Sequence, residues 1–299
     1  MTEMPPLEVE AAQPRRRPAW RQKIRGSLAV AVAMLLVVLF VVAIVPLLPF
    51  YDPYGQDLNF GYLEPMQWAG EKFHIFGTDP LGRDYLSRIA LGTQVSLLIG
   101  VCAVLVSIAT GVALGLVAGF FRGTTESIIM GIADLQLSIP RILLLIAVTA
   151  VIGSGLLNLT LLLGFTSWVS YGRVARAMAL SLREREFVLS ATTQGASAAW
   201  NIRKHLLPNV LPQMVIVGSY ELGLIIIIES SLSYLGLGIQ PPLPSLGLMI
   251  SEGQVYLELN PWISILPGLA IFLMVAGTQF VSQSFTTEGS SDVMLDRAT

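Results

Sequence analysis

Residues 183–209 read REREFVLSATTQGASAAWNIRKHLLPN, a polar segment between long apolar ones. Residues 182–194 contain neither Gly nor Pro, which predicts a helix. Gly195 supplies the left-handed residue that commonly ends a helix. The segment is too polar to enter lipid and too short to be a domain. We therefore expect it to lie at a membrane surface and to dock in a groove of another protein.

A second short helix should follow the first at an angle. Ser197 is a good N-cap for a helix that begins at Ala198. We expect this helix to end near Leu206, because Pro208 disfavours helical geometry in the residue before it. The sequence thus predicts a bent helical hairpin.

Composition sets the fold class. Hydrophobic residues make up 54% of the chain and charged residues only 13%, with a mean hydropathy of +0.68. These values predict an all-α integral membrane protein. A helix needs about twenty apolar residues to cross a bilayer, and six segments meet this need or come close to it: 27–50, 94–121, 127–152, 156–169, 210–232 and 262–280.

Basic residues predict the orientation, because they favour the cytoplasmic side in short segments. They are dense in the first 26 residues and around the polar hairpin, while the segment 51–92 holds only Lys72, Arg83 and Arg88. We expect cytoplasmic termini and a cytoplasmic hairpin. The first apolar segment is too long for a signal peptide core, so it should be retained as a span. The net charge of −2 argues against nucleic acid as a partner.

The segment 51–92 contains a candidate helix start, with Asp79 as N-cap and Pro80 as first residue. An apolar stripe follows at spacings of four: Leu81, Tyr85 and Ile89. This pattern predicts a helix along the outer membrane surface that ends near Gly92, either with a gating role or as an entry helix that merely sets up the second span. His74 has no neighbouring pattern of metal ligands, so we expect a solvated loop residue and no metal site.

Two features of the spans indicate contacts inside the membrane. Glycines recur every four residues on one face of the second span and allow another helix to approach closely: Gly111, Gly115 and Gly119. Acidic residues are costly in lipid, which makes Asp134 and Glu221 candidates for a translocation path or a helix interface. Glu229 is a third candidate, although its position near the outer end also allows contact with water. The lone Cys102 in the second span is a small packing residue.

The chain shows no nucleophile with a base, no phosphate-binding loop and no metal-ligand cluster, so catalysis is not expected. If the protein moves a solute uphill, the energy comes from an ion gradient or from another subunit. Ion-coupled carriers usually contain paired half-repeats, and no convincing internal repeat is visible. The docking hairpin is therefore the main functional feature.

The hairpin resembles the "EAA" loop of permease subunits in bacterial ABC importers. The matching positions are Glu186, Ala191, Gly195, Ala196, Ser197, His205 and Pro208. Of the Glu-Ala-Ala triplet only Ala191 matches.

More specifically, the chain is similar over nearly its whole length to the second permease of the dipeptide, oligopeptide and nickel importer family. Further matches are FGTDPLGRD at 76–84, ESSLSYLGLG at 229–238, and Pro-Pro at 241–242. The family often has Trp where Leu246 stands, and residues 283–287 replace its usual ending.

The resemblance implies a type I importer permease in the bacterial inner membrane, with one N-terminal span and a five-helix core. The implied organisation is a cytoplasmic tail (1–26), a first span (27–50), a periplasmic loop (51–92), a core (93–284) with a cytoplasmic coupling loop (172–208), and a cytoplasmic tail (285–299). The implied partners are a second, similar permease, two ATPase subunits that hold ATP and Mg, and an extracytoplasmic solute-binding protein. The chain itself would bind no cofactor.

Trp200 is either a bulky anchor in the ATPase groove or an interfacial membrane aromatic. Two other functions stay open at this point. A secondary transporter that works alone would show ion-driven uptake, and a noncatalytic membrane scaffold would show no transport. The sequence does not identify the solute; peptides, nickel, glutathione-like, sugar and opine solutes all fit the resemblance.

Overall fold

The computed structural model describes the backbone of residues 19–296 and the side chains of residues 29–283. Most of the predicted N-terminal tail, with Arg15–Arg17, therefore lies outside the described residues, as does Arg297. The helices are α1 (Ala19–Ala43), α2 (Tyr85–Phe121), α3 (Gly123–Ser138), α4 (Arg141–Ile152), α5 (Leu156–Leu182), α6 (Glu186–Thr193), α7 (Ala198–Asn201), α8 (Leu207–Tyr234), α9 (Leu246–Gly253) and α10 (Trp262–Asp296). A short antiparallel hairpin, β1 (Gln67–Ala69) and β2 (Lys72–His74), lies between α1 and α2.

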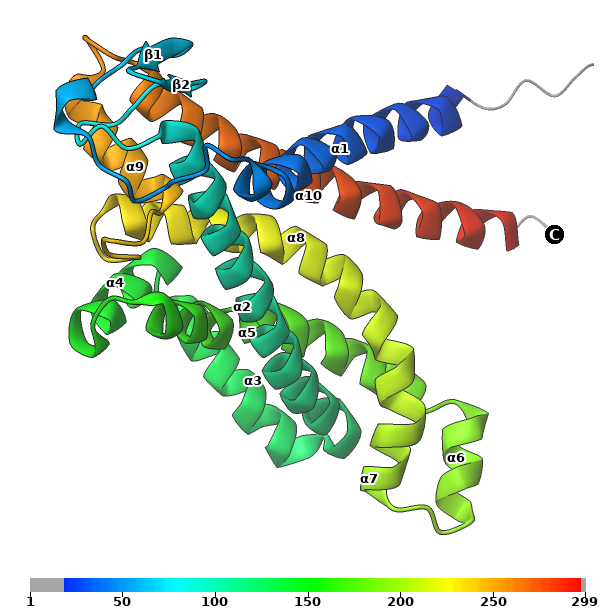
Figure 1. Cartoon of the computed structure of the whole chain (residues 1–299). Helices are drawn as coiled ribbons and strands as arrows, with labels where there is room; N and C mark the ends of the chain where they lie inside the picture. Colours follow the sequence, from blue (N-terminus) through cyan, green and yellow to red (C-terminus); the bar gives the residue numbers. More distant parts are fainter. Residues whose placement is uncertain (1–18, 297–299) are drawn as a thin grey trace, which may run out of the picture.

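The helical body is built around α2, which packs along α5 and α8 (Figure 1). One buried apolar cluster joins α2 to α4, α5 and α8, and a second joins α2 to α5 and to the start of α8. A third cluster joins α2, α9 and α10 with Val38 of α1. The helix α1 lies against α10, so it is an addition to one side of the body.

Four described helices are long and apolar enough to cross a membrane: Ala29–Leu47, Tyr85–Phe121, Ala198–Tyr234 and Trp262–Gln283. The bent pair α3 and α4 makes a fifth if it is taken as one span. The helix α5 is less apolar, but its 27 residues give it a length of about 40 Å, enough to cross a bilayer core. The count of six spans stays a prediction.

The predicted third span, 127–152, is not one straight helix. The helices α3 and α4 meet at 91°, and Ile139 between them is extended, with φ −99° and ψ 127°. Pro140 causes the break, because its ring forces the preceding residue out of helical geometry and its nitrogen donates no hydrogen bond. The helix α4 thus starts in the middle of the apolar region.

The prediction of a surface helix from Pro80 to Gly92 is wrong. The helix α2 begins at Tyr85 and continues without a break to Phe121, so Gly92 lies inside it. The N-cap is Asp84, whose carboxylate accepts hydrogen bonds from the Ser87 backbone N–H at 2.8 Å and from the Ser87 hydroxyl at 2.6 Å. The segment from Tyr85 to Gly92 is therefore the first part of the second span.

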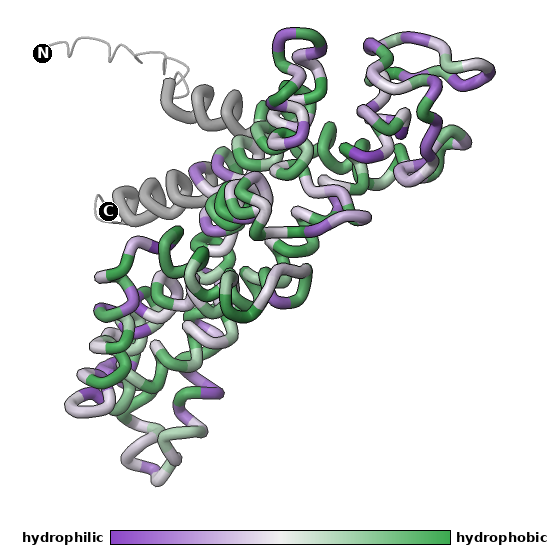
Figure 2. Tube along the Cα trace, turned by 90° about the vertical axis from the view of Figure 1, so that its left-hand side faces the viewer, coloured by the Kyte–Doolittle hydropathy of each residue, from purple (hydrophilic) through white to green (hydrophobic). Residues whose placement is uncertain are grey.

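The α1–α2 loop with its β-hairpin lies at one end of the molecule, and α6 and α7 lie at the other (Figure 1). Hydrophobic residues dominate the helical body between them, while hydrophilic residues are common in the loops at both ends (Figure 2). At its far end, α10 continues to Asp296, so residues 285–296 extend the last helix where a tail was predicted.

Candidate functional site

The polar hairpin consists of α6 and α7. The chain leaves α5 through a turn in which the Arg185 N–H donates to the Leu182 carbonyl at 3.1 Å, a break that the sequence did not reveal. The helix α6 then ends in a Schellman motif: the Ala196 N–H donates to the Ala191 carbonyl, and the Gly195 N–H donates to the Thr192 carbonyl, each at 3.0 Å.

Both predicted caps are present. Gly195 has a φ of +89°, which reverses the chain between the two helices. The Ser197 hydroxyl accepts a hydrogen bond from the Trp200 N–H at 3.2 Å. The Asn201 side chain, which the sequence did not single out, is buried and donates to the Thr192 hydroxyl at 3.1 Å. These bonds hold α6 and α7 at a fixed angle.

The prediction that the second helix ends before Pro208 is wrong. The helix α7 continues through a π-helical turn (Ile202–Leu206) directly into α8, in which Pro208 lies in the first turn. The Leu207 N–H donates to the Ile202 carbonyl, five residues back. Pro208 has no N–H to donate to the turn before it, and the π-helical turn carries the chain past this missing bond. The hairpin and α8 are therefore one continuous element, Ala198–Tyr234.

Three rings gather on the hairpin. The His205 ring lies 4.9 Å from the Trp200 ring and 5.4 Å from the Phe187 ring, measured between centroids. Trp200 is 47% exposed and Phe187 is 44% exposed. Glu186 and Pro208 are also exposed, while Ala191 and Ala196 are half-buried. Exposed aromatic residues are typical anchors of protein interfaces, and Phe187 was not predicted as one.

The three glycines predicted to permit close packing all lie against α5. A Cβ added at Gly111 would stand 2.5 Å from the Trp168 carbonyl oxygen. At Gly115 and Gly119 the nearest atoms would be the Gly172 carbonyl oxygen at 2.4 Å and the Ala179 Cβ at 2.6 Å. Any side chain at these positions would push the two helices apart.

The candidate path residues fall into different surroundings. Asp134 of α3 is exposed and forms an ion pair with Arg173 of α5, with 2.6 Å between Oδ1 and Nη2. A second carboxylate of α3, Glu126, forms an ion pair with Arg176. Glu221 of α8 is buried, accepts a hydrogen bond from the Ser170 hydroxyl at 2.7 Å, and lies 3.7 Å from a guanidinium nitrogen of Arg141.

The expectation that Glu229 reaches water is wrong, because its exposure is 0%. Its carboxylate accepts hydrogen bonds from four serine hydroxyls at 2.8–3.3 Å: Ser96 of α2, Ser230 and Ser233 of α8, and Ser245 just before α9. This pocket holds together the ends of α2, α8 and α9 nearest the α1–α2 loop. A search of the sequence for spacings would not have found it, because the serines come from three separate segments.

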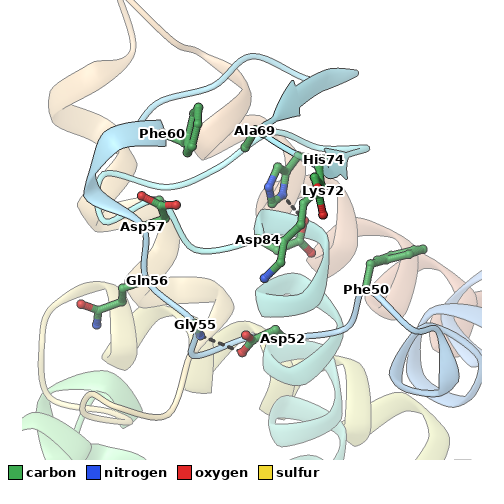
Figure 3. Close-up of a pocket in the computed structure, with 13 residues that line it drawn as sticks. Phe50, Asp52, Gly55, Gln56, Asp57, Phe60, Ala69, Lys72, His74 and Asp84 are labelled. Atoms are coloured by element: carbon green, nitrogen blue, oxygen red, sulfur yellow. Dashed lines mark hydrogen bonds and ion pairs between the residues drawn. The ribbon is translucent and has the colours of Figure 1, made fainter.

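The expectation that His74 is a solvated loop residue is also wrong. His74 is 7% exposed, and its Nδ1 lies 2.8 Å from Asp84 Oδ1. The pair lines a cavity of about 540 Å³ in the α1–α2 loop, together with Asp52, Asp57 and Lys72 (Figure 3). Asp52 and Asp57 accept backbone N–H bonds of their own loop, so these carboxylates shape the loop. Within residues 29–283, no group of His, Cys, Asp and Glu side chains could hold a metal ion.

Comparison with known proteins identifies the family. Residues 111–286 match the model of the binding-protein-dependent transport system inner membrane component. The glutathione transport system permease protein GsiD of Pectobacterium atrosepticum is 38% identical over 259 residues, which cover 87% of this chain and 85% of that protein. The di/tripeptide transport system permease protein DppC of Pseudomonas aeruginosa is 35% identical over 84% of this chain and 83% of its own length.

The oligopeptide transport system permease protein OppC of Haemophilus influenzae is 31% identical over 91% of this chain and 88% of its own. Among solved structures, an inward-facing form of the MetNI methionine ABC transporter has the same fold, with a TM-score of 0.53 and 19% identity over 66% of this chain and 94% of that one. The fold and the hairpin thus define an ABC importer permease. The chain belongs to the family of binding-protein-dependent transport system inner membrane components.

Proposed function

We propose that this chain is one of two similar permeases in an ATP-driven importer for peptides or related small solutes. Relatives at 31–38% identity bear the names of glutathione, di/tripeptide and oligopeptide permeases. In this proposal the two permeases form the path, two partner ATPases bind and hydrolyse ATP with Mg, and an extracytoplasmic binding protein delivers the solute. This chain then carries no cofactor and catalyses no reaction itself.

The observation that carries the proposal is the continuity of the hairpin with α8. Because α7, the π turn and α8 form one element, a displacement of the hairpin by an ATPase moves the helix that bears Glu221 and Glu229. The hydrogen-bonded caps keep the hairpin stiff enough to transmit that displacement. The coupling residues are Glu186, Ala191, Gly195, Ala196, Ser197, Trp200, His205 and Pro208.

The proposed orientation puts the hairpin and both termini in the cytoplasm of a bacterium, with the α1–α2 loop in the periplasm. The distribution of basic residues supports this orientation. So does the location of the hairpin and the α1–α2 loop at opposite ends of the molecule (Figure 1).

A pull-down with defined partners tests the proposal. This chain, tagged and co-expressed with a second permease and the ATPases of the same importer, should retain the ATPases through purification in mild detergent. In liposomes the complex should hydrolyse ATP faster when the loaded binding protein is added. Ion-driven uptake by this chain alone, without ATPases, would instead show a secondary transporter.

A further inference from the structure

A charged cluster inside the helical body is separate from the hairpin and from the serine pocket. Arg141 is the first residue of α4, directly after the 91° bend. Glu221 lies in α8, and its Oε2 is 3.7 Å from Arg141 Nη1. The hydroxyl of Ser170 donates to the other oxygen of Glu221, and Arg141 donates to the hydroxyl of Ser167. Tyr171 lies close enough to interact electrostatically with both charges.

The Arg141–Glu221 ion pair is a loose one, with 3.7 Å between its charged atoms. Three buried polar atoms of the cluster make no hydrogen bond to any described residue: Glu221 Oε2, Arg141 Nε and Tyr171 OH. Leaving such groups unpaired is unfavourable in a protein interior, and more so in a membrane. Asp79 in the α1–α2 loop shows the contrast, because it bonds the Arg83 side chain at 2.6 Å and also accepts two backbone N–H bonds.

The cluster is also open on one side. The Arg141 side chain is 29% exposed, whereas that of Glu221 is 6% exposed. The helix α4 buries only Leu145 and Thr149, and its other apolar side chains include the exposed Ile142 and Leu143. Helices that begin inside the membrane are common where a path passes, since their ends need polar surroundings.

We propose that Arg141 and Glu221 form a dipolar contact for a zwitterionic solute within the path. The guanidinium binds the carboxylate of the solute, and the Glu221 carboxylate binds its ammonium group. Arg is suited to this role because its planar fork can donate two hydrogen bonds to a carboxylate. Without solute the two charges partly neutralise each other, which limits the cost of keeping them in the membrane. This inference rests on the proposed function and adds the residues that contact the solute.

Transport assays with blocked solutes test the proposal. The complex in liposomes is given a free dipeptide, its N-acetylated form and its C-amidated form, each at a concentration that saturates the binding protein. Arg141→Gln should lower uptake of the free and the N-acetylated dipeptide about tenfold, because one charge-assisted hydrogen bond to the solute carboxylate is lost. Uptake of the C-amidated dipeptide, which has no carboxylate, should stay unchanged. Glu221→Gln should lower uptake of the free and the C-amidated dipeptide and leave uptake of the N-acetylated dipeptide unchanged. A uniform loss for all three solutes in both variants would overturn the proposal.

Conservative and control variants separate binding from folding. Arg141→Lys and Glu221→Asp keep both charges, and should reach the membrane and raise the KM for the free dipeptide with little change in maximal rate. An unchanged KM would also overturn the proposal. Arg122→Gln, in the exposed pair with Glu184, should not change selectivity. Retention of the ATPases and basal ATP hydrolysis are measured in the wild-type complex and in every variant. Loss of either property in the wild-type complex would contradict the proposed function and not this contact.

Discussion

Gly115 and Gly172 bring α2 and α5 into backbone contact. A Cβ at Gly115 would stand 2.4 Å from the carbonyl oxygen of Gly172, a distance at which the backbone itself must shift. Because the glycines one turn before and one turn after face α5 in the same way, the two helices approach along much of their length. This contact is the centre of the helical body.

Gly115→Ala should therefore destabilise the protein, by about 1–3 kcal/mol, the usual cost of overpacking. Thermal unfolding of the purified chain in detergent measures the effect. Gly131 of α3 is the matched control, because a Cβ there would have no atom within 4 Å, so Gly131→Ala should leave the unfolding temperature unchanged or raise it. Equal unfolding temperatures for the two variants would show that α2 and α5 do not pack through these glycines.

Gly195→Val should uncouple ATP hydrolysis from transport. The φ of +89° costs a β-branched residue about 1–2 kcal/mol, while Asn tolerates positive φ better. No atom lies within 4 Å of an added Cβ, so backbone conformation and not space decides the outcome. We expect the Val variant to reach the membrane but to lose ATPase retention or solute-stimulated hydrolysis, and Gly195→Asn to keep most of both. Wild-type coupling in the Val variant would show that the hairpin does not transmit the motion.

The orientation can be tested by labelling single cysteines. With Cys102 replaced by Ser, a cysteine at Gln67 on the exposed β-hairpin should react with an impermeant thiol reagent added outside the cell. A cysteine at Ala198, at the start of α7, should react only after the membrane is opened. The reverse result would overturn the proposed topology.

Glu229→Leu should loosen the end of the body that carries α9. Removing the carboxylate leaves buried hydroxyls without their acceptor, at about 1–3 kcal/mol for each unsatisfied group. Glu229→Gln keeps one acceptor oxygen and should cost less. Thermal unfolding in detergent ranks the variants, and Ser231→Ala is the control because its exposed hydroxyl bonds only the Ile227 carbonyl. If Glu229→Leu is as stable as the control, the serine pocket does not hold the helices together.

Local chemistry explains why the sequence predicted the hairpin and the glycine face. The left-handed turn at Gly195 and the cap at Ser197 depend on bonds to residues within five positions. The spacing of the three glycines fixes them on one helix face whatever that face contacts. The apolar composition and length of the spans likewise predicted a helical membrane protein before any packing was known.

Only the tertiary structure decided which polar groups meet and which prolines break a helix. Pro140 separates α3 from α4, whereas Pro208 follows a π turn and, like Pro212 and Pro267, lies within a helix. Glu229 accepts one of its hydrogen bonds from Ser96, 133 residues away in the chain, and Glu221 accepts from Ser170, 51 residues away. Such pairs follow from how the helices cross, because a buried carboxylate takes whatever donors the packing places beside it.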